Sequence, residues 1–198
     1  MLISFFNFIT GFGDSAITGA FAVVMAVFFL IAKERRVAFA LIAAFLLSVV
    51  LIALGKIILY SRCNALPFAF LDLGSPSGHT ALSVAVYGTF AIIVSLAQTG
   101  KRRILPYLFA VPFISLIALS RVVLGFHTKG DVLIGLSTGI LTCLVVWRLF
   151  LKGEKIHCRW GLLMLAGLLI FRLLGLHFPA EDIINAISEY IRGHVRTC

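Results

Sequence analysis

Long apolar runs without a charged residue are the feature that most constrains this chain. Six of them follow one another, at residues 16–32, 37–54, 81–97, 104–119, 132–147 and 160–171. Because lipid offers no partner for free backbone groups, each run should be a helix that bonds its own backbone. Several runs are shorter than the ~20 residues of a span, and flanking residues that face the bundle interior can complete them. The sequence therefore predicts an all-α polytopic membrane bundle with six transmembrane helices.

Basic residues occupy alternate connections between these runs. The three clusters are Lys33, Arg35 and Arg36; Lys101, Arg102 and Arg103; and Arg148, Lys152, Lys155 and Arg159. The positive-inside rule places all three in the cytoplasm, so the connections at 55–80 and 120–131 should face outward. Because the charges are divided among separate connections, they form no single face for nucleic acid. We expect an integral membrane protein whose functional groups face outward, which in a bacterial inner membrane is the periplasm.

Both ends of the chain predict helices that lie on the membrane surface. Residues 1–15 are aromatic-rich, short and interrupted by glycine, and residues 180–198 carry isoleucines at helical spacing opposite charged residues. For both segments we expect an anchoring or packing role. The chain is thus interpreted as one domain, 1–198, with a six-span core at 16–178 that carries its site between residues 56 and 131.

Two histidines in the outward connections suggest acid–base and nucleophilic chemistry. His127 and Asp131 are four residues apart, which places them on one helix face if a span begins there. A carboxylate that accepts one ring N–H leaves the other nitrogen free to act as a nucleophile. In the other connection, Ser77 is a predicted helix N-cap, Gly78 permits close approach of a phosphate, and His79 is placed to act as a general acid.

These residues form two motifs that resemble signatures of the type 2 phosphatidic acid phosphatase (PAP2) superfamily. The chain reads Pro-Ser-Gly-His at residues 76–79 and Ser-Arg-x5-His-x3-Asp at residues 120–131. In the second motif, Arg121 would give a bidentate fork for phosphate. The first family signature, Lys-x6-Arg-Pro, is only approximated by Lys56 and Arg62, which have five residues between them and Cys63 in place of proline. Lys56 and Arg62 are therefore candidate phosphate contacts.

The resemblance implies a metal-independent phosphatase that uses no cofactor and acts on lipid phosphates through a phosphohistidine at His127. Candidate substrates are undecaprenyl diphosphate, which the short outward connections favour, phosphatidic acid, phosphatidylglycerol phosphate and the phosphates of lipid A. A lipid-to-lipid phosphotransferase, a non-enzymatic anion or lipid transporter, and a zinc site built from His79, His127 and Asp131 are the alternatives. We expect the lipid substrate and membrane lipids as partners, and infer neither nucleic acid nor an obligate protein partner.

Overall fold

The computed structural model describes residues 2–61, 75–154 and 156, and every regular element in these ranges is helical. The longer helices are α1 (Leu2–Thr10), α2 (Ser15–Ile31), α3 (Arg35–Ser61), α4 (Gly78–Ser83), α5 (Thr89–Leu96), α6 (Leu105–Val123) and α7 (Lys129–Val146). Short 3-10 or π turns join or extend them: η1 (Gly11–Gly13), η3 (Val84–Gly88), η4 (Gly100–Ile104) and η5 (Trp147–Leu151). The all-α expectation is confirmed.

The described residues contain four helices that are long and apolar enough to cross a membrane. These are Arg35–Ile58, Gly78–Leu96, Gly100–Val123 and Lys129–Leu151. A fifth is possible if α1 with η1 and α2, which meet at a bend of 47°, count as one broken span. The sixth predicted run, at 160–171, and the predicted tail helix at 180–198 lie outside the described residues. Four to five spans are therefore supported, where the sequence predicted six.

Two helices extend further than the apolar runs indicated. α3 continues to Ser61 and α6 to Val123, so Lys56 and Arg121 belong to helices and not to outward loops. Both side chains are buried between helices: Lys56 is only 2% exposed and Arg121 only 6%. A charged side chain that faces the bundle interior does not end a membrane helix.

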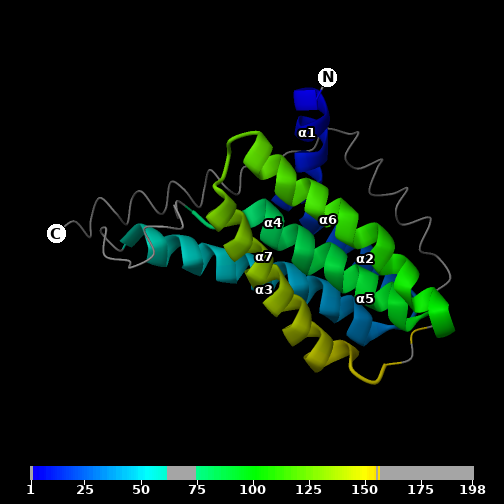
Figure 1. Cartoon of the computed structure of the whole chain (residues 1–198). Coiled ribbons are helices and arrows are strands. Elements are labelled where there is room, and N and C mark those ends of the chain that lie inside the picture. Colours follow the sequence, from blue (N-terminus) through cyan, green and yellow to red (C-terminus); the bar gives the residue numbers. More distant parts are fainter. Residues whose placement is uncertain (1, 62–74, 155, 157–198) are drawn as a thin grey trace.

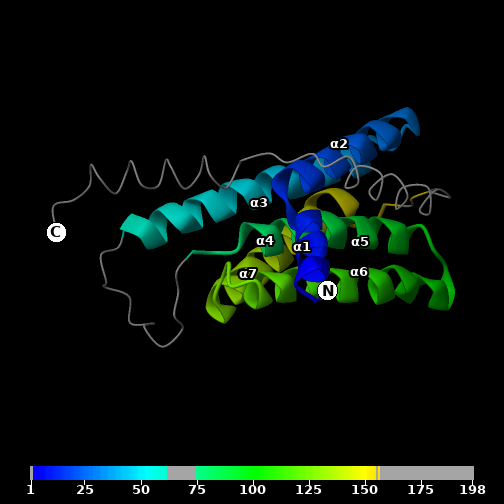
Figure 2. The same ribbon diagram turned by 90° about the horizontal axis from the view of Figure 1, so that it is seen from above.

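The segment from α4 to α5 is the central helix of the bundle. In this span 78% of the residues are buried, against 28% to 39% in the other three. Figure 1 shows α4 and α5 running beside α6, and Figure 2 shows α4 and α5 lying between α2 with α3 on one side and α6 on the other. Helix α7 packs against both α4 and α3. Residues at the beginning of α4 are therefore surrounded by other helices.

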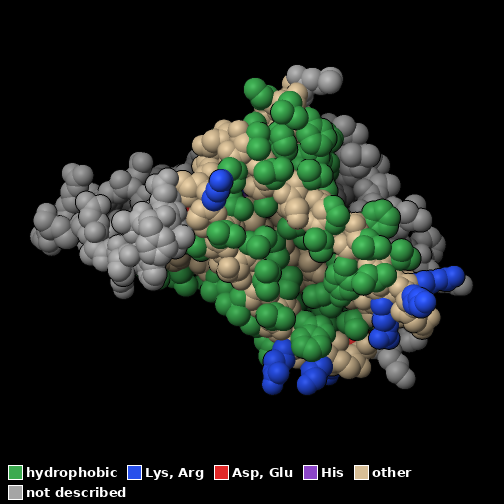
Figure 3. Space-filling view, in the orientation of Figure 1, with side chains coloured by type: hydrophobic (Ala, Val, Ile, Leu, Met, Phe, Trp, Pro, Cys, Tyr) green, Lys and Arg blue, Asp and Glu red, His purple; other side chains and the backbone are tan. Residues whose placement is uncertain are grey.

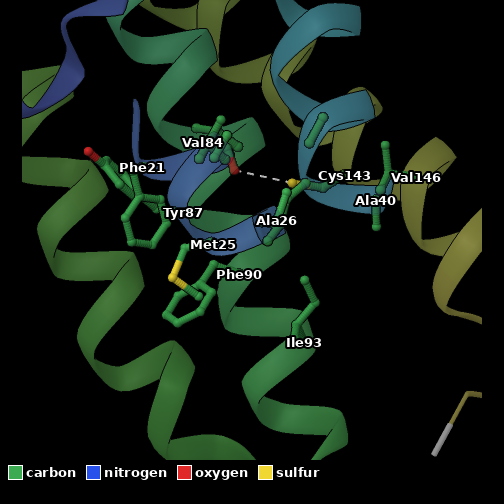
Figure 4. Packing of buried hydrophobic residues seen from close by; sticks show 14 of the residues in the cluster. Phe21, Met25, Ala26, Ala40, Val84, Tyr87, Phe90, Ile93, Cys143 and Val146 are labelled. Carbon is green, nitrogen blue, oxygen red and sulfur yellow. Dashed lines mark hydrogen bonds between the residues drawn. The ribbon is translucent and has the colours of Figure 1, made fainter. Parts of the chain in front are cut away.

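Aromatic side chains and a cysteine fill the centre of this packing. Phe21 from α2 meets the rings of Tyr87 and Phe90 edge-on, at centroid distances of 5.5 and 5.2 Å. On the other side the Cys143 thiol donates to the carbonyl oxygen of Val84 at 3.2 Å, as Figure 4 shows. The core thus ties α2 and α7 to the central helix.

Two glycines allow α7 to approach this central helix closely. A Cβ added to Gly135 would lie 2.5 Å from the carbonyl oxygen of Ser77, and one added to Gly139 would lie 2.5 Å from the Cβ of Val84. Small residues four apart are a common way for membrane helices to bring their backbones together. The contact holds the beginning of α7 beside the beginning of α4.

Basic side chains gather at the other end of the bundle. Figure 3 shows most of the visible Lys and Arg side chains along the lower and lower-right rim of a surface that is otherwise largely hydrophobic, with one more at the upper left. Arg36 forms an ion pair with Glu154, with Nη1 and Oε1 2.6 Å apart. Arg36 of the first basic cluster therefore lies beside the segment that follows Lys152 of the third.

Candidate active site

Asp131 joins the two segments that carry the histidine motifs. Its Oδ2 accepts a hydrogen bond from the amide of Thr128 at 3.1 Å, while its own amide donates to the Thr128 hydroxyl at 3.2 Å. This reciprocal capping box begins α7. Its Oδ1 accepts from the Ser75 amide at 2.8 Å, and its carbonyl oxygen accepts from the Ser77 amide at 3.1 Å. One residue thus fastens the approach to α4 onto the start of α7.

His127 contacts Asp131 from a loop and not from a helix face. α7 begins at Lys129, so the expected shared helix face is wrong. The chain turns at Gly125, which has a φ of +72°, and the His127 amide donates to the carbonyl oxygen of Arg121 at 3.2 Å. This turn places Nδ1 of His127 3.7 Å from Oδ2 of Asp131. That separation is longer than a hydrogen bond, so the contact is electrostatic in this structure.

Arg121 lies in the last turn of α6, with its guanidinium held on two sides. The guanidinium carbon lies 4.5 Å from the centroid of the Phe126 ring, within the range of a cation–π contact. Nη1 donates a hydrogen bond to the hydroxyl of Thr10 at 3.1 Å. The partner on α1 comes from a part of the chain for which the sequence predicted only an anchoring or packing role.

The start of α4 has the predicted N-cap. The Ser77 hydroxyl accepts hydrogen bonds from the amide of Thr80 at 3.5 Å and from its hydroxyl at 3.0 Å, and Ser77 is fully buried. Helix geometry gives the first-turn amides of Gly78 and His79 no acceptor within the helix. His79 is half-buried and lies in this first turn. Because Ser77 is bonded to Asp131, both histidines lie at the same end of the bundle.

Lys56 reaches the same end from α3. It continues the buried face that includes Ser48 and Ile52, four and eight residues earlier. Its neighbour Gly55 faces Pro76, since a Cβ added there would lie 3.5 Å from the Pro76 Cγ. This turn of α3 therefore adjoins the Pro-Ser-Gly-His motif. Arg62, the other basic candidate, lies outside the described residues.

Sequence reasoning missed the contribution of the N-terminal segment. Besides the bond from Arg121 to Thr10, Gly13 lies against the central helix, where an added Cβ would be 3.0 Å from the Cβ of His79. The only local sign was the Gly-Phe-Gly interruption after α1. For the zinc alternative, we find no group of three His, Cys, Asp or Glu in the described ranges that could hold a metal ion.

The fold and these residues define a helical, membrane-type protein in which two histidines, an arginine, a lysine and an aspartate lie at one end of the bundle. Residues 60–155 match the family model of the PAP2 superfamily. Members are phosphatases, so the match implies a hydrolase of phosphoric esters. The matched segment includes both histidine motifs, while Lys56 lies just ahead of it. No curated protein and no solved structure matches the chain.

Proposed function

We propose that the protein is a membrane lipid phosphatase that hydrolyses the terminal phosphate of a lipid monoester or diphosphate through a phosphohistidine. The observation that carries this proposal is the set of hydrogen bonds by which Asp131 holds the His79 and His127 segments together inside the family-matched region. The reaction uses side chains alone, without a cofactor. The preferred substrate is undecaprenyl diphosphate.

In the first half of the reaction, His127 attacks the phosphorus atom. Its Nδ1 faces Asp131, so Nε2 is the attacking atom, and the carboxylate stabilises the positive charge that the ring acquires. An N–P bond forms while the bond from phosphorus to the leaving oxygen breaks. His79 donates a proton to that oxygen, and the lipid product departs. The contact between His127 and Asp131 is expected to shorten when substrate binds, as catalytic hydrogen bonds commonly do.

In the second half, water replaces the histidine. His79, which is now neutral, takes a proton from the water as the oxygen attacks phosphorus and the N–P bond breaks. Inorganic phosphate leaves, and both imidazoles return to their starting protonation states. The overall reaction consumes one water and releases the lipid product and phosphate.

Fixed positive groups would stabilise the charge on the phosphoryl oxygens. Arg121 and Lys56 are buried cations from α6 and α3, and Arg62 is a third candidate from the sequence. The amides of Gly78 and His79 point along the axis at the start of the central helix, where a helix favours an anion. Ser77 holds these amides in place through its cap.

The place of the site in the bundle supports a lipid substrate. Figure 1 shows the beginnings of α4 and α7 at the end of the bundle away from the junction of α5 and α6, which carries basic residues. With the basic end in the cytoplasm, the site would face the periplasm of a bacterial inner membrane. The connection from α6 to α7 is short, at residues 124–128. It offers few groups for a large head group, which favours a diphosphate.

The proposal is tested with purified protein and four lipid classes: undecaprenyl diphosphate, phosphatidic acid, phosphatidylglycerol phosphate and lipid A. We expect phosphate release with and without chelator, fastest with the first lipid. His127→Ala should lower the rate by more than about 1,000-fold, whereas His157→Ala, in the basic segment after α7, should not change it. Equal rates in His127→Ala and wild type would remove His127 from the mechanism.

The same preparation distinguishes hydrolysis from the alternatives. With substrate labelled in its terminal phosphate, wild-type protein should acquire an acid-labile, base-stable label, and His127→Ala should not. Label that leaves only after an acceptor lipid is added would indicate a phosphotransferase. Neither label nor phosphate release with any lipid would favour a transporter. The charged residues Lys56, Arg121 and Asp131 lie near helix ends and not at mid-span, which argues against a transporter.

A further inference from the structure

The N-terminal segment forms part of the wall around the proposed phosphate site. Thr10, the last residue of α1, accepts a hydrogen bond from Nη1 of Arg121, a residue 111 positions later in the chain. Three residues on, Gly13 packs so closely that an added Cβ would lie 2.8 Å from Cγ2 of Ile117 and 3.0 Å from Oγ of Ser83. Both contacts are directed at α4 and α6, where the candidate residues lie.

Several interactions fix this segment in place. The buried hydroxyl of Tyr87 donates to the carbonyl oxygen of Phe12 at 2.6 Å. The Phe12 ring meets the rings of Phe8 and Phe113 edge-on, at 5.3 and 5.4 Å. Asp14 then caps α2 by accepting from the Ala16 amide at 2.7 Å. A segment held in this way can transmit a defined position to Arg121, which a mobile anchor could not do.

We propose that Thr10 is a positioning residue that sets the orientation of the Arg121 guanidinium toward phosphate. The inference rests on the proposed function, because it requires Arg121 to bind the phosphoryl group. A guanidinium is planar and donates from a rigid fork, so its plane and its rotation must both be correct for bidentate binding. The Phe126 ring fixes the plane, and the hydrogen bond to Thr10 fixes the rotation within that plane.

The contact should act mainly on the chemical step. The charge on the phosphoryl oxygens is distributed differently in the transition state than in the bound substrate. A donor that already points at those oxygens stabilises the transition state without having to move. A guanidinium that can rotate would still attract the anionic substrate, so KM changes little. We expect Thr10→Val, which keeps the shape and removes the acceptor, to lower kcat by about 10-fold, because small misplacements of catalytic groups have effects of this order or larger.

A pair of matched variants isolates the hydroxyl. Thr10→Ser retains the acceptor and should restore kcat to within about two-fold of wild type. Thr138→Val makes the same chemical change on α7. There the Thr138 hydroxyl donates to the carbonyl oxygen of Ile134 in its own helix, so this variant should leave kcat unchanged. If Thr10→Val does not fold, comparison of Thr10→Ala with Thr10→Ser tests the same hydroxyl.

A double-mutant cycle with Arg121→Lys separates positioning from general packing. If Thr10 acts through the guanidinium, Thr10→Val should have no further effect on kcat in the Arg121→Lys background. Equal kcat in Thr10→Val and wild type, or a full 10-fold loss in both backgrounds, would overturn the inference while the proposed function stands. If Arg121→Lys and His127→Ala both retain wild-type rates, the proposed function itself has failed.

Discussion

At the scale of single residues, Asp131 combines an architectural role with the proposed chemical one. Its two carboxylate oxygens accept from amides on different segments, Ser75 and Thr128, and its Oδ2 also faces His127. An asparagine offers only one acceptor oxygen and presents an NH2 group to the other amide. The two roles therefore cannot be removed separately by this substitution.

Asp131→Asn is expected to lower both stability and activity. The substitution removes one buried hydrogen bond and leaves the asparagine NH2 group facing a backbone N–H. Together these changes should lower the free energy of unfolding by about 1 to 3 kcal/mol. Thermal unfolding in detergent and phosphate release measure the two effects. Asp14→Asn is the control, because Asp14 accepts through one oxygen at a helix N-cap, where asparagine serves equally well. A stable Asp131→Asn protein would contradict the fastening role.

Lys56→Met tests the buried cation from α3. Removal of one fixed charge from a phosphoryl site should lower kcat/KM by about 100-fold, the order seen when a single oxyanion donor is lost. Lys152→Met, at the exposed basic end, is the matched change and should have no effect on phosphate release. Wild-type kinetics in Lys56→Met would exclude this lysine from phosphate binding.

At the scale of elements, the close contact between α7 and α4 determines the distance between the two histidine segments. Gly135→Ala would bring a Cβ within 2.5 Å of the Ser77 carbonyl oxygen, which is backbone and cannot move without moving the start of α4. We expect a loss of about 1 to 3 kcal/mol in stability, together with reduced phosphate release. Gly55→Ala is the control, since its Cβ would meet Pro76 at an ordinary 3.5 Å. Unchanged melting in Gly135→Ala would show that the helices can separate without cost.

The all-helical fold and the helix cap at Ser77 could be predicted from the sequence, for reasons that are local. Ser77 carries its cap signal within four residues, and the histidine motifs are short and occur in a fixed order. The ends of α3 and α6 could not be predicted, because the apolar runs end before Lys56 and Arg121 whereas the helices continue past these residues. The contact of Thr10 with Arg121 leaves no local pattern, since it depends on packing across 111 residues.

At the scale of the whole molecule, the candidate site and the described residues of the basic clusters lie at different ends of the bundle. Labelling with a membrane-impermeant maleimide tests their orientation in cells, in a background where all cysteines are replaced. Cysteine at Lys129, exposed at the start of α7, should react from outside. Cysteine at Arg102, exposed in η4 just before α6, should react only after permeabilisation. The reverse pattern would place the site in the cytoplasm.

The bond between Thr10 and Arg121 also places the end of α1 at the same end of the bundle as the candidate site. The nine residues of α1 extend about 13 Å as a helix, which is less than half of the ~30 Å hydrocarbon layer. We therefore expect the amino end of α1 to lie on the membrane side on which the site opens, with α2 leading away from it across the bilayer. A fluorescent or enzymatic reporter fused to that end would identify this side of the membrane without any substrate.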